Sequence, residues 1–257
     1  MKIVVIGGSG RIGTKLVANL RQEDCRVFEA SRRDGVDTVT GAGLERALED
    51  AQIVVDVSNS PTLTGEAPLR FFEASGRNLL AAGRAAGVRH HIALSIVGVD
   101  RLASIDYFRA KMLQEGLIVE SGIPFTIVRS TQFFEFIRDV VQDGTAREIP
   151  ISPALVQPIA GEDVADALAD ATFGDARNAW IEIAGPEQWR LDAVATEIAT
   201  AFEDNRRVVA DVHARYFGAE LEERSLLPGP DAYIGSLRFE DWLRESLQPA
   251  WATTRKQ

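Results

Sequence analysis

Three glycines, each separated by two residues, follow the first apolar run of the chain and constrain its fold more than any other feature. The run at residues 3–6 ends at Gly7, and Gly10 and Gly13 follow. A strand that turns in this way into a helix brings backbone N–H groups and a helix N-terminus up to a phosphate. Apolar residues at helical spacing over residues 12–20 supply the expected helix. The segment therefore predicts a dinucleotide-binding loop rather than an ordinary glycine-rich turn.

Each glycine has a separate expected role. Gly7 permits the sharp turn after the strand, Gly10 lets a pyrophosphate approach the backbone, and Gly13 lets the helix pack close to the sheet. The residues predicted to form this part of the cofactor site are Gly7, Gly8, Ser9, Gly10, Arg11, Ile12 and Gly13.

The end of the second predicted strand, residues 26–30, indicates which dinucleotide binds. About twenty residues beyond the last glycine, NAD-binding chains carry an acid that holds the ribose, but this chain has Ser31, Arg32 and Arg33. Guanidinium groups can grip a 2′-phosphate, which a carboxylate would repel. We therefore expect NADP(H) to be preferred. NAD(H) stays possible because Glu29 could act as the NAD-type acid, and the arginines could be a solvated loop pair.

Strand and helix patterns alternate over the first two thirds of the chain. Apolar runs predict further strands at residues 53–57, 91–95, 125–129 and 180–183, and helices are expected at 44–48, 68–86, 107–119, 163–172 and 191–202. This alternation predicts an α/β fold of the Rossmann type, with a doubly wound parallel sheet and right-handed crossovers. The length suits one domain over residues 1–257 with a small C-terminal lobe.

Composition argues against several classes of protein. The single cysteine, Cys25, excludes a disulfide within the chain, and the three histidines form no cluster at zinc spacing, so we expect no metal. A net charge of −10 with scattered arginines disfavours nucleic acid as a partner. The chain begins directly with a strand and has no run of about eighteen apolar residues. We therefore expect a cytoplasmic protein that does not bind a membrane.

Three polar residues stand where ligands of such a sheet bind, at the carboxyl ends of the strands. Ser95 ends one predicted strand, and Tyr107 and Lys111 lie one turn apart on one face of the next helix. A nearby cation lowers the pKa of a phenol, which makes it a better acid or base near neutral pH. The same lysine can hold the ribose of a nicotinamide nucleotide. The alternative is a packing tyrosine beside a surface lysine.

The chain resembles the atypical short-chain dehydrogenase/reductases of the NmrA-like group over residues 1 to about 245. The resemblance rests on the glycine loop, on Ser95, Tyr107 and Lys111, and on the stretches at 94–99 and 129–134. It implies that Ser95 polarises a substrate carbonyl, Tyr107 gives it a proton, and Lys111 orients the ribose and tunes Tyr107. NmrA-like members that bind the dinucleotide only as a redox signal generally lack this tyrosine.

Further site residues follow from their places after strands. By the resemblance, Ser58, Asn59 and Ser60 lie beside the adenine ribose and pyrophosphate, although the same residues suit a routine turn. After the strand at 125–129, the residues Gln132, Phe133, Phe134 and Phe136 either line an apolar substrate pocket or belong to the core. The resemblance also implies that roughly 131–160 and 185–250 contribute a substrate lobe, in which residues 210–233 close over the substrate.

Together these features predict an NAD(P)H-dependent oxidoreductase that transfers a hydride between nicotinamide and a small carbonyl or quinone-like substrate. One alternative is a non-catalytic NAD(P)-binding redox sensor that binds a protein partner. Another is an epimerase or dehydratase that holds its NAD(H) tightly. The sequence leaves open the identity of the substrate, the direction of the reaction and the choice between a monomer and a homodimer.

Overall fold

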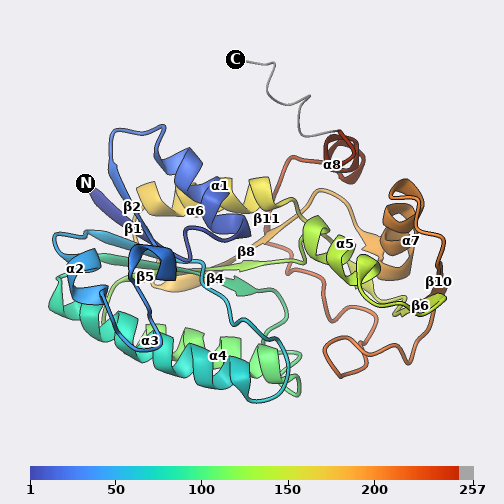
Figure 1. Cartoon of the computed structure of the whole chain (residues 1–257), viewed down its shortest axis with the longest axis horizontal. Helices are drawn as coiled ribbons and strands as arrows, with labels where there is room; N and C mark the ends of the chain where they lie inside the picture. Colours follow the sequence, from blue (N-terminus) through green and yellow to red (C-terminus); the bar gives the residue numbers. More distant parts are fainter. Residues whose placement is uncertain (249–257) are drawn as a thin grey trace.

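A seven-stranded parallel sheet runs through the centre of the computed structural model, which describes residues 1–248 (Figure 1). Its strand order is β11-β8-β5-β4-β3-β1-β2. The strands span Lys2–Ile6 (β1), Arg26–Ala30 (β2), Ile53–Asp56 (β3), His90–Ile96 (β4), Phe125–Ser130 (β5), Ala179–Ala184 (β8) and Tyr233–Ile234 (β11). The prediction of a doubly wound Rossmann-type sheet is confirmed. The expected domain and lobe extend past the described residues at 249–257.

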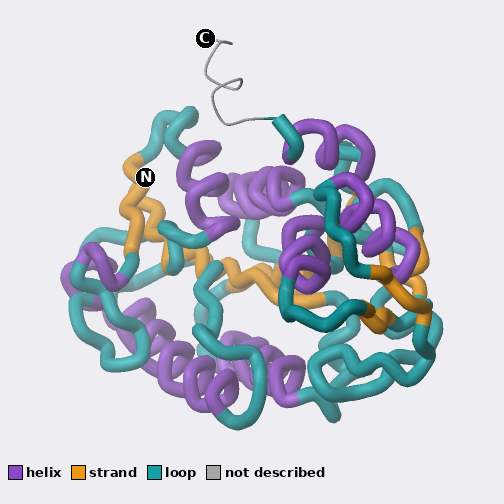
Figure 2. Tube along the Cα trace, turned by 45° about the vertical axis from the view of Figure 1, so that its right-hand side comes forward, coloured by secondary structure: helices purple, strands orange, loops and turns teal. Residues whose placement is uncertain are grey.

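Helices cover both faces of the sheet, as Figures 1 and 2 show. Helices α1 (Arg11–Leu20) and α6 (Gly161–Phe173) pack together on one face. Helices α3 (Ala67–Ala85) and α4 (Asp106–Glu120) pack together on the other, beside the short α2 (Leu44–Leu48). Because strands in such a sheet are covered on both sides, β3 and β5 are buried at every residue, which explains their continuous apolar runs.

The sheet has its switch point between β1 and β3. The chain passes from β1 to β2 on one side and then returns to β3 on the other, which leaves a crevice at the carboxyl ends of β1 and β3. Gly7 follows β1 with a φ of +77°, and a Cβ there would lie 2.9 Å from the backbone of Ser58, which follows β3. A Cβ on Gly13 would lie 2.2 Å from the carbonyl oxygen of Gly7. These contacts agree with the turn and packing roles expected for the two glycines.

A second group of elements lies beside the carboxyl ends of the strands, at the right of Figure 1. Its members are α5 (Phe134–Gln142), β6 (Glu148–Ile151), β7 (Leu155–Val156), β9 (Trp189–Arg190), α7 (Leu191–Ala201), β10 (Arg207–Ala210) and α8 (Phe239–Ser246). Strand β6 pairs with β10 in parallel, and β7 pairs with β9 in antiparallel fashion. We call this group, together with its connecting loops, the lobe. Of its elements, the sequence predicted only the helix α7.

Phe134 belongs to the core of the lobe. Its ring is 1% exposed and lies 5.4 Å from the ring of Phe239 and 5.1 Å from that of Trp242, between ring centroids. These partners belong to α8, so the aromatic contacts fix α8 against α5. The expectation that Phe134 lines the substrate pocket is therefore wrong, because the first turn of α5 directs this ring away from the cavity and into the lobe core.

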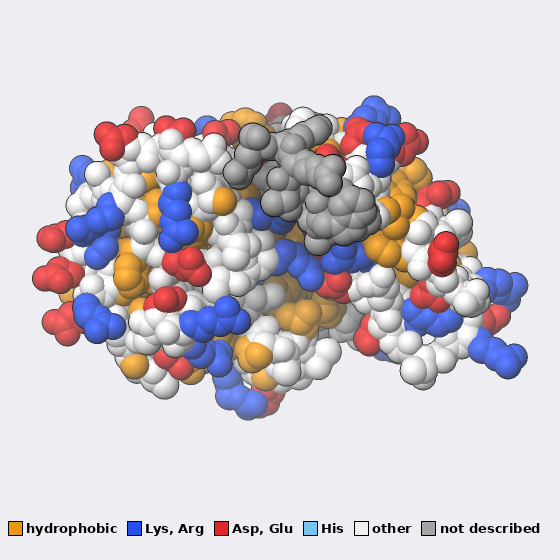
Figure 3. All heavy atoms as spheres, turned by 45° about the horizontal axis from the view of Figure 1, so that its top comes forward, with side chains coloured by type: hydrophobic (Ala, Val, Ile, Leu, Met, Phe, Trp, Pro, Cys, Tyr) orange, Lys and Arg blue, Asp and Glu red, His pale blue; other side chains and the backbone are white. Residues whose placement is uncertain are grey.

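Charged side chains of both signs are interspersed over the face drawn in Figure 3.

Among residues 1–248, none of the helices combines the length and the apolar character that crossing a bilayer requires. Within the same range, no group of three or more His, Cys, Asp or Glu side chains is placed to bind a metal ion.

Candidate active site

A cavity of about 680 Å³ lies at the carboxyl ends of the strands and extends to the lobe. The predicted site residues that line it are Gly7, Ser9, Gly10, Arg11, Ile12, Ser31, Arg32, Arg33, Ser58, Asn59, Ser95, Tyr107, Lys111, Gln132 and Phe133. The structure thus brings together the predicted glycine loop, the arginine pair and the tyrosine–lysine pair. Gly8, Gly13, Ser60 and Phe134 do not line the cavity. Gly13 lies where the start of α1 packs against the backbone of Gly7, and Ser60 is buried beside Asn59.

The start of α1 is suited to hold a phosphate. Gly10 is its N-cap and offers no capping side chain, and no acidic residue stands in the first turn. The first N–H groups of this helix therefore retain the partial positive charge that anions prefer. Any side chain at Gly7 would collide with the loop after β3, so the backbone itself forms the wall of the cavity here. This cradle fits the pyrophosphate of a dinucleotide.

The residues after β2 form a short 3-10 helix at Arg32–Asp34. The hydroxyl of Ser31 donates a hydrogen bond to Asp34 over 2.6 Å and closes this turn, while Arg32 and Arg33 face the cavity with exposed side chains. Glu29, the alternative ribose-binding acid, is not among the lining residues. Its carboxylate lies 3.8 Å from Arg21, and its side chain occupies the space beside Gly8.

Asp37 is an acidic residue of the cavity that the sequence analysis missed. Its Oδ1 accepts hydrogen bonds from the backbone N–H groups of Val39 (2.8 Å) and Thr40 (3.3 Å). The carboxylate therefore holds a turn at the edge of the cavity. An aspartate followed by a threonine-rich turn is the signal that could have indicated it.

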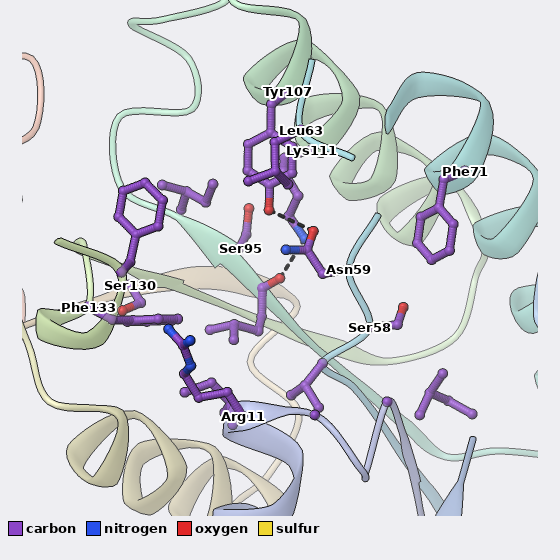
Figure 4. Close-up of a pocket in the computed structure, with 18 of the residues that line it drawn as sticks. Arg11, Ser58, Asn59, Leu63, Phe71, Ser95, Tyr107, Lys111, Ser130 and Phe133 are labelled. Carbon is purple, nitrogen blue, oxygen red and sulfur yellow. Dashed lines mark hydrogen bonds between the residues drawn. The ribbon is translucent and has the colours of Figure 1, made fainter. Parts of the chain in front are cut away.

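Tyr107 is held at the cavity by Asn59 and by other aromatic rings. Its hydroxyl donates a hydrogen bond to Oδ1 of Asn59 over 2.8 Å (Figure 4). Burial raises the pKa of Tyr107 above its usual value, and the bond to Asn59 offsets only part of this rise. The sequence led us to expect that Lys111 lowers this pKa, and that expectation is wrong. The hydroxyl is a neutral hydrogen-bond donor.

The ammonium group of Lys111 is bonded within the protein. It donates to the carbonyl oxygen of Leu94 over 2.7 Å and to Oε1 of Gln114, and Nε2 of Gln114 donates to Asp56 over 2.9 Å. The ring of Phe72 lies 4.5 Å from the ammonium nitrogen. Burial lowers the pKa of Lys111 to about 8, although the charges of Asp56 and Glu115 oppose that shift.

Ser95 is bonded to a buried ion pair. Its hydroxyl donates to Oε1 of Glu115 over 2.5 Å, and Arg129 holds both oxygens of this carboxylate at 3.0 and 2.6 Å. In this arrangement the hydroxyl proton of Ser95 is used in the hydrogen bond to Glu115. The hydroxyl therefore offers lone pairs rather than a proton to the cavity. The carbonyl-polarising role implied for Ser95 is not the arrangement in the structure. A charged residue inside the apolar strand β5 was the sequence signal for this ion pair.

Aromatic side chains from the lobe close one end of the cavity. The ring of Phe217 lies between those of Tyr107 and Phe136, at centroid distances of 5.7 Å from each and interplanar angles of 27° and 12°. Phe217 has a φ of +49°, which costs free energy for any residue with a side chain. It forms a tight turn with Gly218, closed by hydrogen bonds between Tyr216 and Ala219. This turn belongs to the stretch expected to close over a substrate.

Comparison with known proteins agrees with this geometry. The profile of a protein family described as NAD(P)H-binding matches residues 7–173, from the glycine loop to the end of α6. The chain belongs to this NAD(P)H-binding family. The membership confirms the resemblance to the NAD(P)-binding, short-chain-dehydrogenase-like proteins on which the sequence analysis relied.

A curated reductase is similar in sequence to this member of the NAD(P)H-binding family. The (4-alkanoyl-5-oxo-2,5-dihydrofuran-3-yl)methyl phosphate reductase of Streptomyces griseus is 31% identical over 144 residues, which cover 51% of this chain and 48% of that protein. The chain spans about half the length of the curated relatives it matches.

Solved structures share the fold at low sequence identity. An NADPH-dependent quinone oxidoreductase from Escherichia coli, complexed with NADPH, has a TM-score of 0.64 at 17% identity, covering 82% of this chain and 78% of that one. The UDP-glucose 4-epimerase of Thermus thermophilus, in complex with NAD, has a TM-score of 0.63 at 16% identity, covering 97% and 94%. At these identities the likeness establishes the fold.

Proposed function

We propose that this protein is an NAD(P)H-dependent oxidoreductase acting on a small carbonyl or quinone-like substrate. The observation that carries the proposal is the position of Tyr107. Its neutral hydroxyl, held by Asn59, lies in the same cavity as the glycine loop at Gly7 and Gly10. A proton donor and a dinucleotide cradle in one cavity are the two parts that a carbonyl reductase requires.

The residues present fit a nicotinamide dinucleotide, with NADP(H) preferred. The start of α1 and the glycine loop would hold the pyrophosphate, and Arg32 and Arg33 would bind a 2′-phosphate. The position of Glu29 beside Gly8, out of the cavity, supports this preference. When bound, the cofactor supplies the hydride to the substrate.

Tyr107 would supply the proton. As the carbonyl carbon gains the hydride, its oxygen becomes basic and accepts the proton of the Tyr107 hydroxyl, so the O–H bond of the phenol breaks and the O–H bond of the product alcohol forms. The phenolate then regains a proton from water. In the ligand-free protein this proton is hydrogen-bonded to Asn59, so the hydroxyl would turn from Asn59 to the substrate oxygen when a substrate binds. The raised pKa of Tyr107 keeps this proton in place until the substrate oxygen becomes more basic.

A non-catalytic dinucleotide sensor is the second candidate, and one observation favours it. The proton of Ser95 and the ammonium of Lys111 are both bonded inside the protein rather than presented to a substrate. A sensor would use the same glycine loop and arginine pair without needing a proton donor.

Turnover assays separate these candidates. Purified protein would be mixed with NADPH or NADH and with a panel of aldehydes, ketones and quinones, and loss of the reduced nicotinamide absorbance would be followed. We expect NADPH to be consumed with at least one compound and the Tyr107→Phe variant to lose that activity. Tight NADPH binding without turnover across the panel would favour the sensor. Native mass spectrometry that finds NAD⁺ retained through purification would instead favour an epimerase or dehydratase.

A further inference from the structure

The side-chain amide of Asn59 has one fixed orientation in the cavity. Its Oδ1 accepts hydrogen bonds from the backbone N–H of Ser60 over 2.9 Å and from the hydroxyl of Tyr107 over 2.8 Å (Figure 4). A backbone N–H can only donate, so the amide atom that faces Ser60 must be the oxygen. Nδ2 makes no hydrogen bond to the part of the chain that the structure describes, and Asn59 is an exposed residue that lines the cavity. Nδ2 is therefore the amide atom that remains for a ligand.

The N–H groups of Nδ2 lie close to the phenol proton. Oδ1 and Nδ2 share one carbon atom, so with Oδ1 2.8 Å from the hydroxyl oxygen of Tyr107, Nδ2 is no more than about 5.4 Å from that oxygen. In a planar amide, one N–H bond runs parallel to the C=O bond, so it points to the side on which Tyr107 lies. One acceptor atom can take hydrogen bonds of about 2.9 Å from both groups at this separation. Asn59 and Tyr107 can therefore donate to the same substrate oxygen.

The other polar side chains of the tyrosine–lysine region do not offer a second donor. The hydroxyl proton of Ser95 is used in the bond to Glu115, and the ammonium group of Lys111 is bonded to the carbonyl oxygen of Leu94 and to Gln114. Reduction of a carbonyl places negative charge on its oxygen, and a fixed donor beside that oxygen stabilises the transition state. Asn59 supplies such a donor.

We propose that Asn59 is a catalytic residue, whose Nδ2 donates a hydrogen bond to the substrate carbonyl oxygen and stabilises the negative charge that hydride transfer places there. Tyr107 turns its hydroxyl from Oδ1 to the same oxygen and gives up its proton, whereas Nδ2 keeps both of its own. Oδ1 keeps the bond from Ser60, so the amide holds its orientation while Tyr107 reacts. This inference rests on the proposed reductase function and names a further residue of its mechanism.

Binding of a stable oxyanion tests the inference without turnover. The probe is 4-nitrophenol, which is ionised under mildly alkaline conditions, and 4-nitroanisole is the matched compound without an oxyanion. Calorimetry with the NADP⁺-loaded protein gives the Kd of each. We expect Asn59→Ala to weaken the binding of 4-nitrophenolate about 10-fold or more, as loss of one charge-assisted hydrogen bond implies, and to leave the binding of 4-nitroanisole unchanged. The kcat with any accepted compound of the carbonyl panel should fall by about 10²-fold or more.

The same replacement in the Tyr107→Phe protein separates a direct role of Asn59 from one exercised through Tyr107. Without the phenol hydroxyl there is no proton for Asn59 to hold, so a 10-fold loss that persists there, within a factor of about two, comes from Nδ2. Asn59→Leu is a second variant, because it fills the space of the amide without restoring a donor. Asn19 provides a control, since its amide nitrogen donates to Asp166 and it does not line the cavity. Asn19→Ala should leave both Kd values unchanged.

Several outcomes would overturn the inference. These are no binding of 4-nitrophenolate by the unmodified protein, an affinity for it that Asn59→Ala and Asn59→Leu leave unchanged, or an effect that disappears in the Tyr107→Phe protein, which would make Asn59 a positioning residue. A weaker Kd for NADP⁺ in Asn59→Ala with an unchanged affinity for 4-nitrophenolate would assign the amide to the cofactor instead. If 4-nitrophenolate is bound through Asn59 but NADPH is never consumed with the carbonyl panel, the reductase proposal fails while the oxyanion site is supported.

Discussion

The hydroxyl of Tyr107 and the amide oxygen of Asn59 lie 2.8 Å apart and join helix α4 to the loop after β3 across the cavity. The same amide oxygen also accepts a hydrogen bond from the backbone N–H of Ser60 at 2.9 Å, so its orientation is fixed by the loop. The Tyr107 ring lies near those of Phe72 and Phe217. The proton of the phenol therefore has a defined position in the ligand-free protein.

Replacing Tyr107 by Phe should separate binding from chemistry. The variant loses one hydroxyl and keeps the ring, so the Kd of NADPH should remain unchanged. Turnover on any accepted carbonyl substrate should fall by roughly 10²-fold or more, as loss of a general acid implies. Steady-state kinetics and calorimetry measure the two effects.

The exposed Tyr233 is a suitable control for this variant, because its side chain is 53% exposed and does not line the cavity. Tyr233→Phe should leave turnover unchanged. An unchanged kcat in Tyr107→Phe would show that the hydroxyl is a structural group and would favour the sensor.

Replacing Arg32 by Ala should remove most of the preference for NADPH over NADH. A charged hydrogen bond to the 2′-phosphate is worth on the order of 1.5–3 kcal/mol, and NADH has no such group to lose. Calorimetry with both cofactors measures the difference. Arg77 is a control, since it pairs with Glu73 on the exposed face of α3, and Arg77→Ala should leave the preference intact. Equal affinities for the two cofactors in the unmodified protein would contradict the prediction.

The parallel sheet could be predicted because its strands are short apolar runs separated by helix patterns. The lobe could not be predicted in the same way. Its strands β7 and β9 have two residues each and pair across more than thirty positions of the chain, so no local pattern of alternation marks them. Their stability comes from tertiary packing, which periodicity does not reveal.

The candidate site, too, could be predicted only in part from the sequence. The placement of Tyr107 and Lys111 in one cavity followed from strand ends and helix spacing, but their partners did not. Lys111 bonds to Leu94 and Gln114, and Ser95 to Glu115, through side-chain directions that a sequence does not specify. The same limit explains Phe134, because helical periodicity alone does not decide which of several adjacent phenylalanines faces the core.

Lys111 should make the stability of the protein depend on alkaline pH. Burial lowers its pKa from 10.5 to about 8. Between these values the unfolded chain binds a proton that the folded protein has released, so the free energy of unfolding rises with pH, by about 3 kcal/mol at most. Below pH 8 both states carry the charge, and the cost of burying it persists.

Urea unfolding at several pH values between 8 and 10.5 tests this dependence. Other groups titrate in the same range, so the quantity to compare is the difference between the unmodified protein and Lys111→Met. That difference should change with pH across this window. A constant difference would show that Lys111 keeps an ordinary pKa.

The buried pair of Glu115 and Arg129 should contribute far more to folding than an exposed pair. Its side chains are 10% and 9% exposed, so Glu115→Ala leaves a buried guanidinium without its counter-charge. We expect a loss of about 3–5 kcal/mol in the free energy of unfolding. Glu73→Ala breaks the exposed pair with Arg77 and should cost at most about 1 kcal/mol. Similar losses in the two variants, measured by urea unfolding, would contradict this ranking.

Phe133 and Phe134 are adjacent in the chain but should respond differently to replacement by Ala. Phe134 is 1% exposed and packs against Phe239 and Trp242, so its loss leaves a cavity in the lobe core. The free energy of unfolding of Phe134→Ala should fall by about 3–5 kcal/mol. Phe133 is half-buried and lines the active-site cavity, so Phe133→Ala should raise KM for an apolar carbonyl substrate and cost less stability. Urea unfolding and steady-state kinetics on both variants give the comparison. Equal losses of stability with an unchanged KM would exclude Phe133 from the substrate site and leave Tyr216 and Phe217 as its aromatic wall.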